Sequence, residues 1–142
     1  MNRIRIINRS GYPAPEYKTE GSAGCDLRAV LEHPKKLLPL ERAFIPTGIY
    51  ISLPEEYEAQ VRGRSGLNRK HGLVVPVGTV DSDYRGEIGV VIYNLSREEY
   101  TIQPGDSIAQ LVIAPVVRFK FEEVEHLDAT ERGEGGFGHT GK

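Results

Sequence analysis

The stretch Gly78-Thr79-Val80-Asp81-Ser82-Asp83-Tyr84-Arg85-Gly86-Glu87 is the one around which the rest of the chain is organised. Val80 on one side and the apolar run Ile88 to Ile92 on the other are typical of strands, so the polar segment between them predicts the turn of a β-hairpin. Asp81 and Asp83 are two residues apart, and on an extended backbone such side chains point to the same side. Acidic turn residues commonly bond only their own backbone amides. On the evidence of these two residues by themselves, that alternative stays open.

Short strands separated by turn residues are predicted along the rest of the chain, a pattern typical of an all-β sandwich or jelly roll. The expected strands are Arg3 to Asn8, Gly24 to Val30, Lys36 to Leu40, Ala43 to Ile45, Ile49 to Leu53, Tyr57 to Gly63, Ile88 to Leu95, Tyr100 to Ile102, Ile108 to Pro115 and Val117 to Glu123, and the segment Leu73 to Val77 leads into the central hairpin. One short helix is predicted over Leu67 to His71, with Ser65 as its N-cap and Gly72 at its end.

Length and charge limit the classes of function. A chain of 142 residues is the size of one domain, and its formal net charge of -2 gives no general attraction to nucleic acid. The single cysteine, Cys25, excludes an internal disulfide framework and suits a reducing compartment. No apolar run approaches the length of a membrane span, and the N-terminus lacks the apolar core of a signal peptide. We therefore expect a soluble protein in the cytoplasm or elsewhere inside the cell, with no nucleic-acid or membrane partner.

The last residues differ in character from the rest. Residues 125–142 are charged and then glycine-rich, with Leu127 and Phe137 as their only large apolar side chains. We therefore expect a β domain over residues 1–124 and a flexible arm over residues 125–142 that is mobile without a ligand. Most tails of this composition are simply disordered. A lone aromatic ring among glycines also suits an arm that covers a ligand while its amides approach phosphates.

Several other motifs fail on their context. Gly133 to Gly138 fits the dinucleotide fingerprint and Gly133 to Thr140 nearly fits a P-loop, but neither lies between a strand and a helix. The four histidines are scattered and have no paired cysteines, so no zinc site is predicted. A triad of Ser65, His71 and Asp81 lacks the sequence context of an activated serine. Arg64-Ser65-Gly66 at the predicted helix start is a better candidate, because amides, a hydroxyl and a guanidinium together bind anions.

Five segments, in order, resemble the five motifs of the homotrimeric dUTPase family. They are Ala23 to Leu27, Arg64 to Leu67, Gly78 to Glu87, Gly105 to Leu111 and Arg132 to Gly141. The resemblance implies an all-β, jelly-roll-like barrel of the β-clip type with one short helix and a flexible C-terminal arm. It also implies a homotrimer in which the arm of one chain closes over a site on another.

The implied reaction is the hydrolysis of dUTP to dUMP and pyrophosphate, which limits uracil incorporation into DNA and supplies dUMP for dTMP synthesis. By this resemblance Asp81 is the base that activates water for attack at the α-phosphorus, and Asp26 is a supporting residue. The residues implied for phosphate are Arg64, Ser65, Gly66, Gln110 and Arg132. Those implied for uracil and deoxyribose are Gly78, Thr79, Val80, Asp81, Tyr84, Gly89, Phe137 and Gly138. Mg2+ is the implied cofactor, held by the triphosphate and water with no direct protein ligand.

Three positions depart from the family pattern, and two rival functions remain. His139 stands where a serine is usual, Ser107 where an arginine is commoner, and Val75 where many relatives carry asparagine. A dCTP deaminase of the same fold would use a glutamate-based site, and the arrangement from Asp81 to Tyr84 is evidence against it. A nucleotide-responsive binding or regulatory module on the dUTPase fold would share all five motifs, so the sequence leaves that alternative open.

Overall fold

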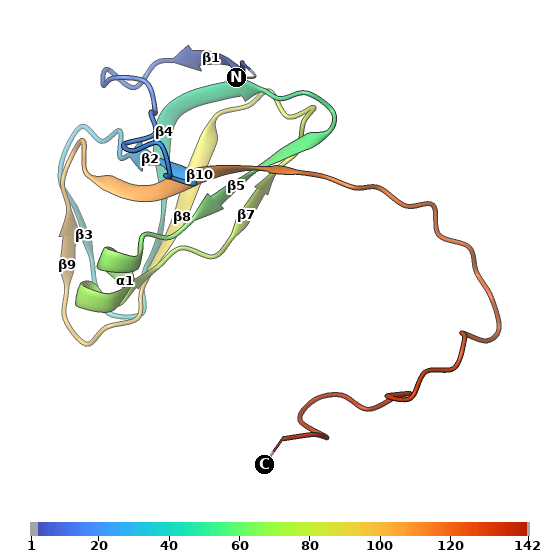
Figure 1. Cartoon of the computed structure of the whole chain (residues 1–142). Coiled ribbons are helices and arrows are strands. Elements are labelled where there is room, and N and C mark those ends of the chain that lie inside the picture. The colour runs from blue at the N-terminus through green and yellow to red at the C-terminus, as the bar shows by residue number, and fades with distance from the viewer. Residues whose placement is uncertain (1–2, 142) are drawn as a thin grey trace.

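The computed structural model describes residues 3–141 and shows a β-rich body from which the C-terminal part of the chain swings away (Figure 1). The described residues form ten strands and one helix. These are β1 (Arg5–Asn8), β2 (Gly24–Arg28), β3 (Lys35–Leu37), β4 (Arg42–Ser52), β5 (Tyr57–Arg62), α1 (Ser65–His71), β6 (Leu73–Val74), β7 (Gly78–Val80), β8 (Ile88–Asn94), β9 (Tyr100–Ile102) and β10 (Ser107–Pro115). The predicted all-β, jelly-roll-like fold with one short helix is confirmed.

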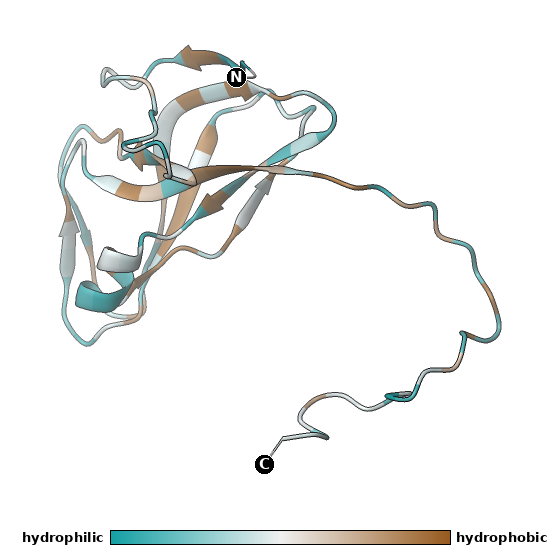
Figure 2. Cartoon of the chain, in the orientation of Figure 1, coloured by the Kyte–Doolittle hydropathy of each residue, from teal (hydrophilic) through white to brown (hydrophobic). Residues whose placement is uncertain are grey.

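Two four-stranded antiparallel sheets enclose the core. Their strand orders are β1-β4-β8-β6 and β2-β10-β5-β7, and a separate pair joins β3 to β9. Side chains alternate between inside and outside along the strands, and both sheets contribute to one apolar cluster that includes Ile45, Val90, Leu27 and Val61. Figure 2 shows this alternation as changing bands along the long strands. Each sheet therefore has an outer face available for chemistry or for another chain.

The predicted β-hairpin around residues 81–87 is wrong. β7 pairs with β5 in one sheet, whereas β8 lies between β4 and β6 in the other. Val80 is buried as the last residue of β7, and Ile88 is buried as the first residue of β8. The segment between them, here called the 81–87 loop, therefore crosses from one sheet to the other. Both ends of the loop are held by buried strand residues, but the two strands are not partners.

Two further strand predictions are corrected. Ala43 to Ile45 and Ile49 to Leu53 belong to the single strand β4, which contains a register shift between Pro46 and Ile49. Gly48 adopts a positive φ of 68° there, which lets the extra residues bulge without ending the strand. Residues 117–123 form no strand within this chain. Strand composition without a neighbouring strand does not produce a strand, because the ladder hydrogen bonds need a partner.

The N-cap of the helix lies one residue earlier in the chain than predicted. Arg64 is the N-cap of α1 and Ser65 is the first helical residue, so the prediction of Ser65 as N-cap is wrong. Gly72 ends the helix in the left-handed conformation with φ 66°, as predicted, and its N–H faces the Leu67 and Asn68 carbonyls. Among residues 3–141, no helix has the length and apolar character needed to span a bilayer.

Candidate active site

Arg64 is held by contacts from two neighbouring strands. Its Nε lies 3.5 Å from Oδ1 of Asp26 on β2, and its Nη1 donates a hydrogen bond of 3.0 Å to the carbonyl of Ser107 on β10. The Arg64 side chain is nevertheless 40% exposed. The guanidinium is therefore oriented by the protein and still has donors available for an anion.

Gln110 lies on the same face of the sheet as Asp26. In the β10 register Gln110 is opposite Asp26 on β2 and opposite Arg62 on β5, and its Nε2 donates to the Gly63 carbonyl at 3.0 Å. A Cβ placed on Gly24 would lie 2.5 Å from Oε1 of Gln110. Glycine at position 24 therefore leaves room for the Gln110 amide, a requirement that sequence reasoning missed.

Ser65 and Gly66 form the exposed first turn of α1. The N-cap makes no side-chain hydrogen bond, and the first bond within the helix runs from Asn68 N to Arg64 O at 3.1 Å. The preceding amides of the helix therefore have no partner within it. A Cβ added at Gly66 would meet nothing within 4 Å, so the space beside this turn is open. The contacts described above bring together five residues, here called the Arg64 cluster: Asp26, Arg64, Ser65, Gly66 and Gln110.

The 81–87 loop folds compactly over itself. Tyr84 N donates to the Asp81 carbonyl at 3.1 Å, and the Tyr84 hydroxyl donates to the Glu87 carbonyl at 2.8 Å. The Tyr84 ring packs against Gly86 so closely that a Cβ at position 86 would overlap it. Asp81 and Tyr84 are both exposed. The loop therefore presents one carboxylate and one aromatic ring to the outside in a defined conformation.

The other residues expected to read a base flank this loop. Gly78 and Thr79 lie on β7, and Val80 is buried in the core, so only its backbone is available to a ligand. Gly89 lies on β8, where the ring of Phe44 covers it so closely that a side chain would not fit. These positions fit a role for the main chain rather than for side chains.

The structure does not bring Asp81 together with Arg64 in one chain. β7 runs antiparallel to β5 with Val61 opposite Gly78 and Ala59 opposite Val80, so Asp81 follows β7 at the level of the first residues of β5. Arg64 follows the other end of β5. At about 3.3 Å per strand residue, the two positions lie on the order of 15–20 Å apart, which is too far for one bound water to bridge.

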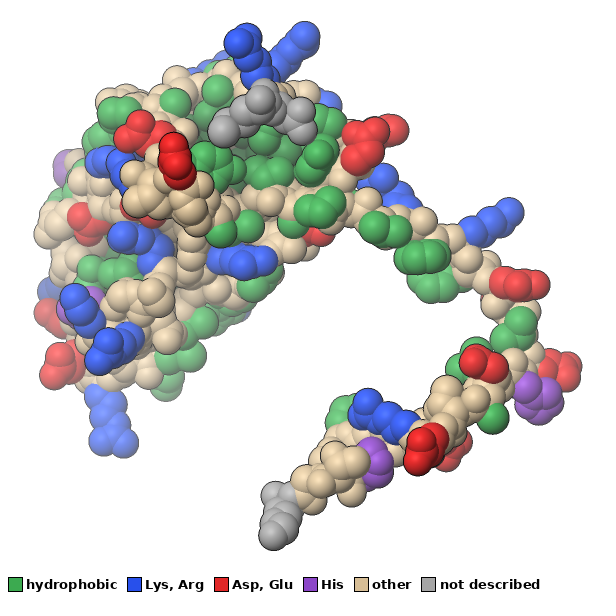
Figure 3. Space-filling view, in the orientation of Figure 1, with side chains coloured by type: hydrophobic (Ala, Val, Ile, Leu, Met, Phe, Trp, Pro, Cys, Tyr) green, Lys and Arg blue, Asp and Glu red, His purple; other side chains and the backbone are tan. Residues whose placement is uncertain are grey.

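The expected arm residues form a third, separate group. Every hydrogen bond of the described residues beyond Arg118 is made within the C-terminal segment itself, including the 2.7 Å bond from Arg132 Nε to the Gly135 carbonyl. Phe137 is fully exposed with a φ of 50°, and Gly138 has a φ of 91°. Figures 1 and 3 show this segment extending away from the body. Arg132, Phe137 and Gly138 therefore touch neither the Arg64 cluster nor the 81–87 loop of their own chain.

The three departures from the family pattern occupy different environments. Val75 is buried in the core and would contact a side chain placed at Gly63. Ser107 supplies the carbonyl that holds Arg64, a role that does not depend on its side chain. The ring of His139 lies against Gly135 within the arm.

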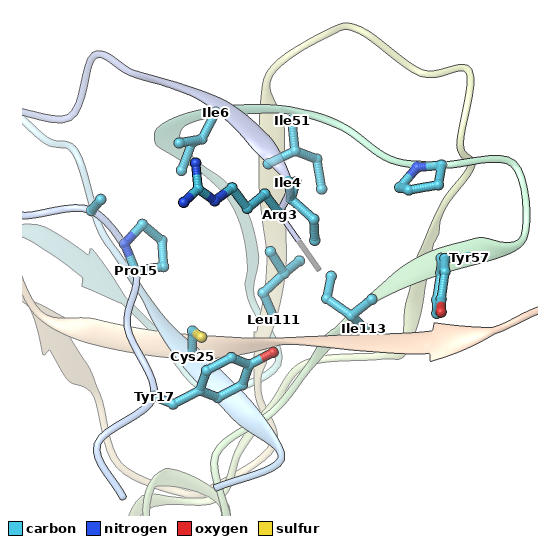
Figure 4. A pocket seen from close by; sticks show the side chains of 12 residues that line it. Arg3, Ile4, Ile6, Pro15, Tyr17, Cys25, Ile51, Tyr57, Leu111 and Ile113 are labelled. Atoms are coloured by element: carbon cyan, nitrogen blue, oxygen red, sulfur yellow. The ribbon is translucent and has the colours of Figure 1, made fainter. Parts of the chain in front are cut away.

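A large apolar cavity lies elsewhere, and no pattern in the sequence indicated it. It has a volume of about 420 Å3 and is lined mainly by apolar side chains of β1, β4 and β10, among them Ile6, Ile51, Leu111 and Ile113 (Figure 4). Cys25 also lines it, and burial raises the pKa of its thiol, with smaller contributions from the charges of Asp26 and Glu16. No predicted site residue lines this cavity, so it is not the place where the expected chemistry occurs.

Within residues 3–141, no three His, Cys, Asp or Glu side chains lie close enough together to hold a metal ion. The carboxylate beside Arg64 is that of Asp26, which is 31% exposed. One partly exposed carboxylate next to an anion-binding arginine fits Mg2+ that arrives on a polyphosphate and keeps water ligands.

Comparisons with known proteins find one family along nearly the whole chain. The family model for dUTPase matches residues 11–141. The deoxyuridine 5'-triphosphate nucleotidohydrolase of Finegoldia magna is 57% identical over 141 residues, which cover 98% of this chain and 99% of that protein.

Two solved structures are similar along most of the chain. The dUTPase of Staphylococcus bacteriophage 80alpha with dUPNHPP has a TM-score of 0.91 and 29% identity, covering 100% of both chains. The work on that protein describes phage dUTPases as controlling the transfer of virulence genes by a proto-oncogenic G protein-like mechanism. A mutant dUTPase of the S. aureus phage phi11, with a coordinated structural Mg(II) ion, has a TM-score of 0.82 and 27% identity, covering 90% of this chain and 100% of that one.

Proposed function

The chain belongs to the dUTPase family and hydrolyses dUTP to dUMP and pyrophosphate, and from this premise we propose the roles of its residues. The observation that carries the assignment is the preformed Arg64 cluster, which combines an oriented guanidinium, a free helix turn and a side-chain amide. These groups suit the phosphate chain of a nucleotide. The Arg64 cluster binds the triphosphate, with Ser65 beside the bridging oxygen that leaves with pyrophosphate and Gln110 on the phosphate chain.

Asp81 is the general base. A carboxylate can orient a water molecule by a hydrogen bond and accept its proton as the water attacks. Its place at the exposed start of the 81–87 loop lets it aim that water at the α-phosphorus of a nucleotide lying along the loop. The water oxygen forms the new bond to phosphorus, the bond to the bridging oxygen breaks, and pyrophosphate leaves.

Main-chain groups read the base. The edge of uracil is offered backbone donors and acceptors from both sheets. They belong to Gly78, Thr79 and Val80 on β7 of one sheet and to Gly89 on β8 of the other. Cytosine presents the opposite pattern, and leaving buried polar groups unpaired makes such discrimination large. Tyr84 packs against the deoxyribose at the position where a ribose would project its 2'-hydroxyl. Its hydrogen bond to Glu87 and its contact with Gly86 support this role, because they fix the ring in one orientation.

Mg2+ is the proposed cofactor. When bound, the ion neutralises charge on the triphosphate and orients it for in-line attack. The triphosphate and water supply its ligands, and Asp26 contributes through water or by holding Arg64 in place. The chain's own contribution is the geometry of the phosphate-binding groups.

A complete site requires more than one chain, and we propose a homotrimer with shared sites. The separation of Asp81 from Arg64 along β5 supports this proposal, because a single chain cannot place both at one nucleotide. In a cyclic trimer the Arg64 cluster of one chain can meet the 81–87 loop of a second. Arg132, Phe137 and Gly138 then come from the arm of a further chain, which closes over the nucleotide.

The segment that leads to the arm also supports assembly. Val117, Phe119 and Phe121 alternate with charged residues and are 77%, 79% and 96% exposed. This is the pattern of a strand with one apolar face, and strand β1 at a sheet edge borders the apolar cavity. We propose that this segment of one chain pairs with another chain and fills that cavity, which would explain why the predicted strand at 117–123 has no partner here.

The proposed function is tested by measuring hydrolysis of dUTP, dCTP, dTTP and UTP by the purified protein and its Asp81→Asn variant. We expect turnover of dUTP alone, and a loss of about a hundredfold or more in the variant, as for removal of a general base. Asp83→Asn is the matched control, because Asp83 is an exposed carboxylate of the same loop without an assigned role. Comparable turnover of UTP or dTTP, or an active Asp81→Asn variant, would contradict the proposal.

A second role as a nucleotide-responsive regulatory module is favoured by one observation, the similarity to a phage dUTPase described as controlling gene transfer. The exposed arm offers a segment that a bound nucleotide could order. Under this proposal, a nonhydrolysable analogue such as dUPNHPP changes the affinity for a partner protein. An enzyme without this role would show no nucleotide-dependent interaction.

A further inference from the structure

The exit of the 81–87 loop is fastened to the bulge of β4. The Thr47 hydroxyl donates to the Ile88 carbonyl at 2.5 Å, and Gly48 N donates to Oε2 of Glu87 at 2.9 Å. Thr47 is fully buried and Gly48 is buried beside it. The backbone amide of Gly48 is available at this point because the register shift between Pro46 and Ile49 takes it out of the β4–β8 ladder.

The amide that binds Glu87 is itself fixed. Gly48 has a φ of 68°, and a Cβ at this position would lie 2.7 Å from backbone atoms of Ser10. Its carbonyl accepts a hydrogen bond of 2.8 Å from Arg9 N. The turn after β1 and the bulge in β4 therefore clamp Gly48 on two sides, and only glycine fits between them. Glu87 is bound to a rigid anchor rather than to a mobile loop.

Glu87 connects this anchor to Tyr84. Its carboxylate accepts from Gly48 N, and its main-chain carbonyl accepts from the Tyr84 hydroxyl at 2.8 Å. The hydroxyl end of the Tyr84 ring lies against Gly86, immediately before Glu87. A shift of Glu87 away from β4 would therefore move the acceptor of the Tyr84 hydroxyl and the surface beneath its ring together.

We propose that Glu87 is a positioning residue that sets discrimination between deoxyribose and ribose, acting through Tyr84 without touching the nucleotide. This inference rests on the proposed function, in which Tyr84 occupies the place of a 2'-hydroxyl. Excluding the 2'-hydroxyl of a ribose requires that the Tyr84 ring stay in place, since a loop that is free to move would make room for that hydroxyl. The carboxylate of Glu87 holds the loop in place through its hydrogen bond from Gly48 N, because a hydrogen bond to a charged acceptor is stronger than one between neutral groups.

The test compares kcat/KM for dUTP and for UTP in the wild type and four variants. Glu87→Ala removes the anchor, and we expect the dUTP to UTP ratio to fall about tenfold, the equivalent of one such hydrogen bond. Glu87→Asp keeps the charge but shortens the reach to Gly48, and we expect a similar fall. Glu87→Gln keeps a neutral acceptor at the right distance, and we expect it to retain part of the selectivity, between the wild type and Glu87→Ala. Glu99→Ala is the control, because this surface carboxylate contacts only Lys36, at 3.7 Å.

A merely structural role for Glu87 gives a different result. It would lower the unfolding temperature or the activity towards both nucleotides alike, leaving the ratio unchanged, and that outcome overturns the inference. Glu87→Asp decides the question if Glu87→Ala does not fold. Failure of the proposed function is recognised separately, because the wild type would then not turn over dUTP at all.

Discussion

Nε of Arg64 lies 3.5 Å from Oδ1 of Asp26, and this pair joins the start of α1 to the middle of β2. The two side chains are 40% and 31% exposed, so solvent screens their attraction. The pair therefore contributes little to folding. Its importance lies in orientation, since Arg64 must present its remaining donors in one direction.

The Asp26→Asn variant tests this orientation. We expect the KM for dUTP to rise severalfold, because Arg64 keeps its bond to Ser107 but loses its charged partner. The free energy of unfolding should change by less than about 1 kcal/mol, as for other partly exposed ion pairs. Steady-state kinetics and thermal unfolding measure the two effects. Glu99→Gln breaks the exposed pair with Lys36 and should leave both unchanged.

Complementation tests whether a site is shared between chains. Asp81→Asn and Arg64→Ala should each be inactive as pure proteins. Because the two residues are far apart along β5, a site in a mixed assembly can take Arg64 from one variant and Asp81 from the other. Unfolding and refolding the two variants together should therefore restore part of the dUTP turnover. Activity that stays at the level of the separate variants would mean that each chain builds its own site.

Deletion of residues 132–142 tests the arm. The described residues of this segment bond to one another and, through Gly133 N, to the Thr130 hydroxyl just before it, and none of these bonds reaches the β body, so we expect no change in unfolding temperature. Loss of Arg132 and Phe137 should lower kcat/KM for dUTP by about a hundredfold, because closure over the nucleotide is lost. Calorimetry and initial rates report the two results. A truncated protein with unchanged kinetics would exclude the arm from catalysis.

Exposed aromatic residues before the arm predict a defect in assembly. Phe119→Ser combined with Phe121→Ser should lower the sedimentation coefficient towards that of a single chain, because the apolar face that contacts a neighbour is removed. Lys120→Ser changes the opposite face of the same segment and serves as the control. If the double variant sediments like the wild type, the segment is not an assembly contact.

The thiol of Cys25 predicts a pH dependence. Burial raises its pKa first, and the charges of Asp26 and Glu16 add to the effect. The thiolate is the reactive form, so at a given alkaline pH the folded protein holds less of it than the unfolded chain. Alkylation should therefore be slower in the folded state and should accelerate only at higher pH than in urea. Equal rates in both states would show that the thiol is not shielded.

The sequence was sufficient to predict most strands and the end of the helix, because both depend on local patterns, whereas the members of the Arg64 cluster were expected from the resemblance to the family motifs. Alternating apolar residues define strands, and Gly72 ends the helix by its own conformational preference. The pairing of strands with one another could not be predicted in this way. β7 and β8 look like the two arms of a hairpin, but β5 and β4 are their partners, and no local pattern reveals that choice.

Two features of the site depend on three-dimensional register and were therefore missed. The distance between Asp81 and Arg64 follows from which residues of β5 and β7 lie opposite each other. The anchor of Glu87 follows from the bulge at Gly48, whose amide carries no side-chain signal. A glycine in the middle of a strand pattern was the one available hint, since such glycines commonly mark bulges. Residues 117–123 have the composition of a strand and lack only a partner.

The placement of Asp81 and Arg64 at opposite ends of β5 has a consequence for dilute solutions. A lone folded chain holds only fragments of the machinery, so specific activity should fall upon dilution even while every chain stays folded. Dissociation would thus inactivate the protein reversibly, and concentrating the sample would restore it. The total activity in a cell would then rise more than proportionally with the concentration of the protein.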